Sequence, residues 1–405
     1  MRKTVIIFLI FGISSYFVLA INTFQINNKN VSLKLISKKY IAGEKIKVTF
    51  NTILNKKTYL IIHNTTGKSI ISPIFEGNKT IFKIPDFFSE KAGILEWKLI
   101  EDNQKILNNF IEILPNNYNK INLESYFGPA SITVGNTNFA SFITIPLDIY
   151  DNPLMDGTII NINEKKENKL TNSKLIVNNL IVNKNVYAIT KTGKIFVSSS
   201  YKNNFSKEFE TIIFPNQAQN FTINFKRLHD FADGNQTTLL KTSVITDEYG
   251  NIIQNGTQVV FIIQKNDLVL KTFGTTLNGI ATAQVLHPEE KNDYSVFAVI
   301  SGIARSNTIN LNYKAIKPNI FYRFSNKNRT LEIGPITSYM NQLVQNGINV
   351  ELIIYKNNKK IENLKERSVN GKVTFQLEET YFTKGIYNFE IKLLGNKKYI
   401  KNINL

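Results

Sequence analysis

Short apolar runs alternate with polar stretches along most of the chain. KIKVTF at 45–50, TYLIIH at 58–63 and SVFAVI at 295–300 are rich in β-branched and aromatic residues, and several such runs are apolar at every second position. Gly, Asn, Asp or Pro separates them at intervals of about 8–12 residues, which is the spacing typical of a β-sandwich. Apart from the N-terminal stretch, no segment sustains an apolar period of about 3.6 residues over several turns. The pattern therefore predicts strands throughout and no core helix.

The sequence also contains internal repeats. DEYGNIIQNGTQVVF at 247–261 has a counterpart in DIYDNPLMDGTIININ at 148–163, and a third copy lies within 336–354. Downstream, TLNGIATAQV at 276–285 is similar to SVNGKVTFQL at 368–377. Such self-similarity indicates tandem copies of one structural unit. The alignment places Asp148 on Asp247, Asn152 on Asn251, and both Gly157 and Gly347 on Gly256.

Polar seams marked by proline divide the chain into four units of similar length. Pro115-Asn116-Asn117 closes the first unit and Ile316-Lys317-Pro318-Asn319 opens the last, as linkers do. About seven short strands per unit without helices is typical of an immunoglobulin-type sandwich. We predict an all-β chain of tandem immunoglobulin-like antiparallel β-sandwiches in an elongated array. The predicted units are 1–20 (a signal peptide), 21–115, 116–221, 222–315 and 316–405.

The third unit carries the most specific motif, a D-x-x-G-N turn followed by G-x-A-x-x-x-V and Y-x-V-x-A strands. This pattern resembles the bacterial immunoglobulin-like repeats of the invasin and intimin type, through Asp247, Gly250, Asn251, Gly256, Gly279, Ala281, Val285, Tyr294, Val296 and Ala298. YIAGEKIKVTF at 40–50 looks more like the sandwich modules of macroglobulin-type proteins. The strands at 382–405 also resemble the C-terminal sorting domain of proteins exported by the type IX machinery of Bacteroidota. These resemblances imply a surface or envelope protein from a Bacteroidota-like organism.

The N-terminus has the order of a secretory signal peptide. Arg2 and Lys3 precede an almost unbroken apolar run from Val5 to Leu19, and Ala20 supplies a small residue for cleavage. An uncleaved membrane anchor is the alternative, because about 18 apolar residues can just span a bilayer. We therefore predict an extracytoplasmic location, in the periplasm, at the outer-membrane periphery or on the cell surface. With no cysteine in the chain, packing alone must stabilise it there.

The formal charge of +18 first suggests a polyanionic partner. The lysines, however, are scattered through polar stretches, such as Lys165-Lys166 and Lys359-Lys360, and form no cluster. Scattered lysines in an exported chain indicate solvated loops, so we expect no nucleic-acid partner. Acidic surface polysaccharide remains a candidate ligand beside protein partners, among them an outer-membrane protein complex.

The acidic residues of the repeated motif allow two interpretations. Calcium prefers six to eight oxygen ligands, and Asp148, Asp151, Asp156, Asp247 and Glu248 offer carboxylates. Against calcium, the third copy has Ser338 and Tyr339 in place of the acidic pair, and Asn or Asp before Gly is what tight turns require. We favour turn chemistry and predict no metal and no cofactor. The structural turn residues are then Asn152, Gly157, Gly250, Asn251, Gly256 and Gly347.

No catalytic constellation stands out. The histidines His63, His229 and His287 are expected in unrelated surroundings, and His229, beside Asp230, is interpreted as a surface-loop residue. No activated nucleophile and no phosphate-binding glycine loop accompanies them. Trp97 alternates with apolar neighbours, which favours a core position over a sugar-binding platform. We predict no catalytic residue and no enzymatic activity.

The function expected from this pattern is a non-catalytic extracytoplasmic scaffold for binding, adhesion or spacing. Tandem sandwiches present loops and edge strands, through which such proteins bind. An accessory subunit of an outer-membrane secretion, assembly or gliding complex is the first alternative. A hydrolase built on a β-sandwich is the second, although no acid and base are paired in the sequence.

Overall fold

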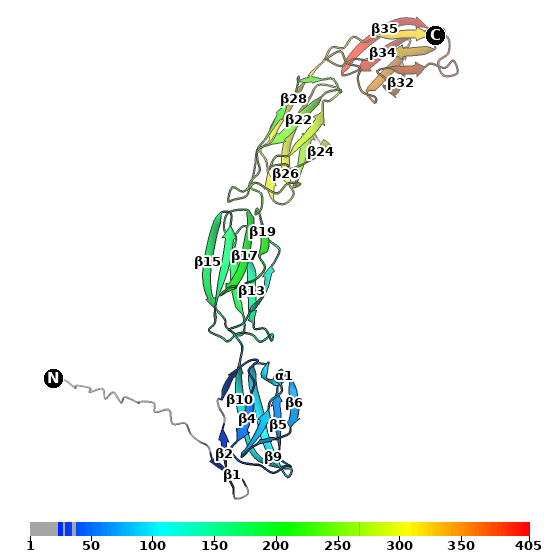
Figure 1. The fold of residues 1–405 in the computed structure, drawn as a ribbon. Helices are drawn as coiled ribbons and strands as arrows, with labels where there is room; N and C mark the ends of the chain where they lie inside the picture. The colour runs from blue at the N-terminus through cyan, green and yellow to red at the C-terminus, as the bar shows by residue number, and fades with distance from the viewer. Residues whose placement is uncertain (1–22, 27–28, 35–37, 267) are drawn as a thin grey trace, which may run out of the picture. The chain divides into compact units, whose positions relative to one another are not determined.

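The computed structural model describes residues 23–26, 29–34, 38–266 and 268–405. Strands succeed one another through these residues, and the chain consists of tandem immunoglobulin-like β-sandwiches (Figure 1). The predicted signal peptide, 1–20, lies outside the described residues. Within the described part of the chain, no helix is long and apolar enough to cross a membrane.

The first sandwich spans residues 23–114 and surrounds Trp97, which is fully buried, as its alternating neighbours predict. Its elements are β1 Thr23–Ile26, β2 Lys29–Lys34, β3 Lys39–Ile41, β4 Lys47–Phe50, β5 Tyr59–Asn64, β6 Gly67–Ile71, β7 Ile74–Glu76, β8 Lys79–Lys83, the single-turn helix α1 Asp86–Ser89, β9 Gly93–Glu101 and β10 Gln104–Leu114. One sheet has the order β1-β2-β4-β8-β7 and the other β3-β10-β9-β5-β6. In β9, every second side chain faces the core, as period-two alternation requires.

The second sandwich spans residues 122–214. Its strands are β11 Asn122–Gly128, β12 Ser131–Thr133, β13 Phe139–Leu147, β14 Ile159–Lys166, β15 Lys169–Ile176, β16 Val182–Tyr187, β17 Gly193–Tyr201, β18 Asn204–Phe205 and β19 Phe209–Phe214. They form the sheets β11-β13-β16 and β12-β19-β17-β14-β15, with β18 paired to β17. Phe142 and Ile162 are fully buried, which places them in the core of the sandwich.

The third sandwich has the same arrangement over residues 223–315. Its strands are β20 Ile223–Lys226, β21 Phe231–Ala232, β22 Thr237–Thr242, β23 Gln258–Lys265, β24 Leu268–Thr275, β25 Thr282–Leu286, β26 Asn292–Ile300, β27 Ala304–Arg305 and β28 Ile309–Ala315. The sheets are β20-β22-β25 and β21-β28-β26-β23-β24, with β27 paired to β26. Two short pairs, β3 with β10 and β21 with β28, are parallel and depart from the predicted antiparallel pattern.

The fourth sandwich spans residues 322–404. Its strands are β29 Tyr322–Ser325, β30 Thr330–Ile333, β31 Asn349–Lys356, β32 Lys359–Arg367, β33 Val373–Gln376, β34 Ile386–Leu393 and β35 Asn396–Asn404. The sheets are β29-β30-β33 and β32-β31-β34-β35. Their facing sides enclose one apolar core that includes Leu331, Leu352 and Ile391.

The described chain falls into two compact units whose division runs through the second sandwich. Residues 132–138 and 187–193 belong with residues 213–405 in unit 2. The other residues of the second sandwich, up to and including Ile212, belong with the first sandwich in unit 1. Ala218 and Phe221 are buried in the core of the third sandwich, which the sequence had assigned to begin at residue 222. We therefore propose to place that seam earlier, at Pro215-Asn216, and keep the other predicted seams.

Limited proteolysis of the full chain tests these seams. Cleavage is expected first near residues 115–120 and 314–319, because linkers open locally at lower free energy than packed sandwiches. Mass spectrometry of the first fragments identifies the cut positions. Early cleavage within 245–263 would contradict the division into four sandwiches.

Candidate functional site

The three copies of the repeated motif share one backbone geometry. The N–H groups of Asp148, Asp247 and Ser338 each donate to the carbonyl four residues later, and an isolated β-bridge closes each turn. Asp151, Gly250 and Asn341 occupy the same turn position, with φ of 60°, 80° and 58°. This left-handed conformation is one that Gly, Asn and Asp adopt more readily than other residues. What the copies share is thus a turn that leads into β14, β23 or β31.

The Asp247 carboxylate is the centre of the turn before β23. Its Oδ1 accepts the N–H groups of Tyr249 at 2.9 Å and Asn251 at 2.8 Å, within the turn itself. Its Oδ2 accepts the N–H of Asn216, in the segment that follows β19, at 2.9 Å. Asp247 is 3% exposed, so the charge is buried only because backbone donors surround it.

Asn251 extends this network to a second segment of unit 2. Its Nδ2 donates to Asp247 Oδ2 at 2.9 Å and to the carbonyl of Thr190 at 2.8 Å, and its Oδ1 accepts the N–H of Thr192 at 3.2 Å. One Asp–Asn pair therefore hydrogen-bonds to its own turn, to the segment after β19 and to the loop between β16 and β17.

The copy before β14 makes the same contacts within unit 1. Asp148 Oδ2 accepts the N–H of Asn116 at 2.8 Å, while Oδ1 accepts the N–H groups of Tyr150 and Asn152. Asn152 donates to the Glu90 carbonyl at 2.7 Å and accepts the N–H of Ala92 at 2.9 Å. In both copies the carboxylate accepts a hydrogen bond from the linker residue that follows a Pro. The Asn side chain binds the loop after α1 in the first copy and the loop after β16 in the second.

Burial alone would disfavour the charged form of Asp247. The hydrogen bonds from the Asn251 side chain and from the N–H groups of Asn216, Asn251 and Tyr249 outweigh it, and the pKa of the Asp247 carboxyl lies below its ordinary value. The carboxylate form is thus the one that stabilises the turn at neutral pH.

The five calcium candidates do not converge on one position. The oxygens of Asp148 and Asp247 accept backbone hydrogen bonds, Asp156 accepts the N–H of Leu180 at 3.1 Å, and Glu248 accepts the Asn216 amide at 3.0 Å. Asp151 is exposed at its turn position. In the described residues, a single group of three or more metal-ligating side chains occurs, and it contains none of these five.

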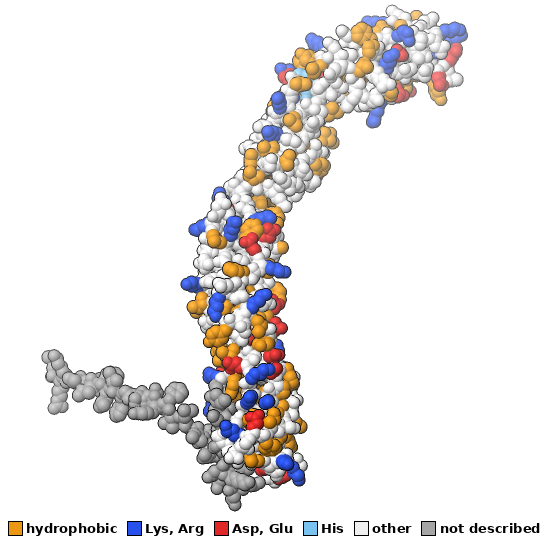
Figure 2. Space-filling view, viewed as in Figure 1, with side chains coloured by type: hydrophobic (Ala, Val, Ile, Leu, Met, Phe, Trp, Pro, Cys, Tyr) orange, Lys and Arg blue, Asp and Glu red, His pale blue; other side chains and the backbone are white. Residues whose placement is uncertain are grey.

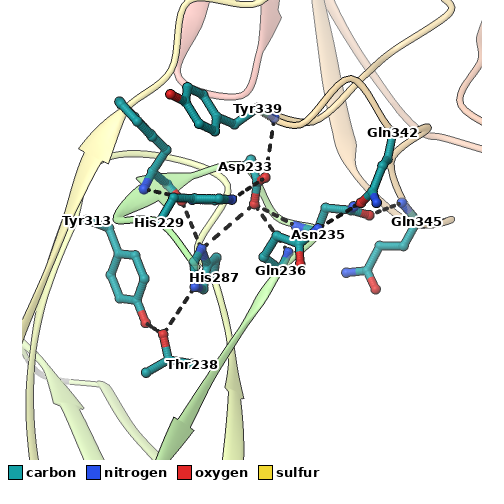
Figure 3. Close-up of polar contacts among 11 residues, drawn as sticks. His229, Asp233, Asn235, Gln236, Thr238, His287, Tyr313, Tyr339, Gln342 and Gln345 are labelled. Atoms are coloured by element: carbon teal, nitrogen blue, oxygen red, sulfur yellow. Dashed lines mark hydrogen bonds and ion pairs between the residues drawn. The ribbon is translucent and has the colours of Figure 1, made fainter. Parts of the chain in front are cut away.

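The third copy receives its carboxylate from another segment (Figure 3). Where Asp247 would lie it has Ser338, and the N–H of the next residue, Tyr339, donates to Oδ2 of Asp233 at 3.3 Å. Oδ1 of Asp233 accepts the N–H groups of Asn235 and Gln236. Gln342, at the position of Asn251, accepts Nε2 of Gln236 at 2.8 Å. The turn before β31 is therefore also held by a buried carboxylate, which comes from the loop between β21 and β22.

Two histidines face this carboxylate, contrary to the sequence interpretation. His229 and His287 belong to one sandwich, their rings lie 5.1 Å apart, and the His287 side chain is fully buried. Nor is His229 a surface residue, since its side chain is 8% exposed. The neighbouring Asp230 forms an ion pair with Lys314 at 2.9 Å and does not orient the imidazole. The acid that the His229 ring faces is Asp233, four residues later in the sequence.

His229, Asp233 and His287 offer the ligand types of a transition-metal site, with ligand atoms within 4.8 Å of one another. Their hydrogen bonds point to a different use. Nδ1 of His229 accepts the N–H of Phe231 at 3.1 Å, and Nδ1 of His287 lies 2.9 Å from the carbonyl of the same residue, to which it donates. If Nε2 of His229 bound a metal, the neutral ring would carry its proton on Nδ1. Nδ1 could then no longer accept the N–H of Phe231. The two rings thus clamp the backbone of β21, and the residues fit a metal poorly.

The clamp leaves Nε2 of His229 facing Oδ2 of Asp233 at 3.5 Å, which is too long for a hydrogen bond. The Tyr339 ring stacks on Phe231, with centroids 4.0 Å apart. His287 accepts or donates at Nε2 with Thr238 at 3.1 Å, and Thr238 contacts the Tyr313 hydroxyl at 2.7 Å. The cluster orients Asp233 toward the Tyr339 N–H, and the hydroxyl groups of Thr238 and Tyr313 within it belong to fully buried residues.

Comparison with known proteins gives similarity at the level of structure. No family model and no curated protein matches the sequence. The chain is similar to FdeC, an Escherichia coli adhesin, with 12% identity over 70% of this chain and 97% of that one and a TM-score of 0.49. It is similar to invasin, a bacterial integrin-binding protein, with 12% identity over 92% of this chain and 79% of that one and a TM-score of 0.46.

The similarity to Escherichia coli alpha-2-macroglobulin, with 10% identity and a TM-score of 0.22, covers 92% of this chain but 29% of that one. At such identities these matches carry no information on activity or partners. A macroglobulin-like first unit and a Bacteroidota origin stay predictions.

Replacing Asp247 by Ala is expected to lower the free energy of unfolding of the third sandwich by about 2–3 kcal/mol, because buried N–H donors lose their charged acceptor. Differential scanning calorimetry of the full chain at neutral pH measures the loss. Glu248→Ala is the control, because that side chain is exposed and no buried donor depends on it. Equal stability of the two variants would contradict the role of the carboxylate.

The stability of the third sandwich is expected to fall as the pH is lowered from about 6.5. Burial lowers the pKa of His287, although the Phe231 carbonyl and Asp233 favour the charged ring. The unfolded chain therefore takes up a proton below pH ~6.5 that the folded chain refuses until its own lower pKa is reached. His287→Asn keeps a donor for Phe231 without titrating, and calorimetry should show a smaller pH slope. The exposed His63→Asn should keep the wild-type slope.

Proposed function

We propose that the chain is a non-catalytic extracytoplasmic scaffold that presents binding surfaces on tandem sandwiches to protein partners. The observation that carries the proposal is the repeated Asp–Asn pair, which occurs twice with the same set of backbone contacts at the ends of successive sandwiches. In these pairs the buried charge stabilises the connections between strands and linker segments. This use suits a protein that spaces its sandwiches and presents their surfaces to partners.

The proposed export rests on the basic, apolar and small-residue order of residues 1–20. The proposed absence of enzymatic activity rests on the use of the buried titratable groups. Asp148, Asp233 and Asp247 all accept backbone hydrogen bonds, and the two buried histidines hold the backbone of Phe231. Each of these groups already uses a lone pair or a proton for the backbone, which favours a structural role over proton transfer to a substrate.

The proposal can be tested with a tagged chain in the native host. Intact cells are treated with protease to measure surface exposure, then cross-linked, and the partners are identified by mass spectrometry. The expected result is an exported chain that recovers the same surface or envelope protein in repeated preparations. Retention in the cytoplasm, or recovery of cytoplasmic proteins alone, would overturn the proposal. Recovery of several outer-membrane assembly subunits in fixed ratio would replace the scaffold by the accessory-subunit function.

A further inference from the structure

The outer face of the larger sheet in the third sandwich carries two apolar rows. Val259, Phe261 and Ile263 of β23 are buried, so Val260 and Ile262 lie on the opposite, outer face. The register across β24, β23 and β26 places Phe273, Val260 and Val299 in one row and Lys271, Ile262 and Phe297 in the next. Figure 2 shows hydrophobic side chains, with few acidic ones, over the part of the chain that Figure 1 labels β24 and β26.

The same rows are mostly polar in the other copies of the repeat. In the second sandwich they read Lys174, Asn161, Ser200 and Asn172, Asn163, Ser198. In the fourth they read Lys365, Glu351, Lys392 and Asn363, Ile353, Glu390. The fold is thus stable with polar residues at these positions, and core packing does not require the apolar rows of the third sandwich. An apolar surface without a structural need marks an interaction site.

The edge strand beside these rows lacks the usual protection. Edge strands are normally blunted by charged side chains, Pro or bulges. The equivalent edge strand β32 carries Lys359, Lys360, Glu362, Lys365, Glu366 and Arg367, and β15 carries Lys169 and Lys174. In contrast, β24 is the edge strand of its sheet, and Lys271 is the one charged residue in its sequence LVLKTFGT.

Both sides of β24 expose apolar groups. Val269 and Phe273, on the outer side, are 50% and 58% exposed, and Leu268 and Leu270, on the side of the core, are 52% and 42% exposed. A partner that lay flat on the outer face would leave Leu268 and Leu270 in water. A strand paired to the open edge of β24 covers both sides at once.

The charges beside the rows select the partner. Lys271 lies within one row, and the Arg305 guanidinium lies 4.2 Å from the Phe297 ring centroid, while neither row contains an acidic residue. A second copy of this chain would place its own Lys271 near this one, and each copy carries a formal charge of +18, so the two copies would repel each other. Charge complementarity therefore favours a partner with carboxylates among its apolar side chains.

We propose that β24 is a docking edge for an extended segment of another protein, which adds to the sheet as a further strand. This strand is mainly apolar, and on its outer face an acidic residue lies two positions from an apolar one. Its apolar side chains continue the Phe273 row, and a carboxylate pairs with Lys271. The inference rests on the proposed function and assigns its protein binding to one strand of the third sandwich.

A library of displayed peptides about ten residues long, sufficient for one strand, provides the probe. It is selected on the full chain, and the affinities of the enriched peptides are measured by fluorescence anisotropy. The first variant is Val260→Asn with Ile262→Asn, which copies the residues of β14 in the same rows. The second is Val269→Lys, which blunts the edge. The control is Leu170→Lys, at an exposed position of β15.

Enriched peptides that are mainly apolar and carry an acidic residue two positions from an apolar one are expected. Binding should weaken at least about tenfold in the Val260→Asn/Ile262→Asn variant and in the Val269→Lys variant, and stay unchanged in the control. Lys271→Glu should reverse the preference for acidic peptides. Peptides without that pattern, or equal affinity for all variants, would overturn the docking edge. A wild-type dimer in analytical ultracentrifugation that Val269→Lys dissociates would also overturn it, in favour of a second copy.

The same variants separate this inference from the proposed function. If the cross-linked cellular partner is still recovered with the Asn double variant, the scaffold stands and the docking edge fails. Unchanged melting temperatures of the variants show that folding does not cause the loss.

Discussion

The rest of the molecule depends on buried carboxylates that accept backbone N–H groups. A carboxylate has only acceptors, so it can be buried at Asp148 or Asp247 only where several donors point at it. Those donors come from the turn and from the segment that follows the preceding strand, at Asn116 or Asn216. Each carboxylate therefore fixes two pieces of chain that are distant in sequence, and its Asn partner fixes a third.

The turn before β31 shows that this requirement concerns the donors and not the position of the acid. Ser338 cannot accept several backbone N–H groups as a carboxylate does, yet the following N–H still finds one in Asp233. Burying Asp233 then requires compensation of its own, which the N–H groups of Asn235 and Gln236 provide. His229 and His287 both hydrogen-bond to the backbone of Phe231 and so hold β21, which precedes the loop that carries Asp233.

Outer sheet faces follow a different rule, because they are free of the core. The alternation of β14, β23 and β31 places equivalent residues inward in all three strands. The two outward residues differ: they are both Asn in β14, Val and Ile in β23, and Glu and Ile in β31. A sandwich can thus keep its fold while one face and one edge specialise. The contrast between β24 and the charged β32 is the clearest sign of such specialisation in the described chain.

The sequence by itself determined the all-β class, the repeated turns and the core position of Trp97, because period-two alternation and turn residues act over a few neighbours. It did not determine that Asp247 bonds to Asn216, that Ala218 and Phe221 belong to the third core, or that His229 meets His287. These contacts join residues far apart in the chain, and the register of paired strands decides them. The two apolar rows likewise became visible only when pairing placed Phe273, Val260 and Val299 side by side.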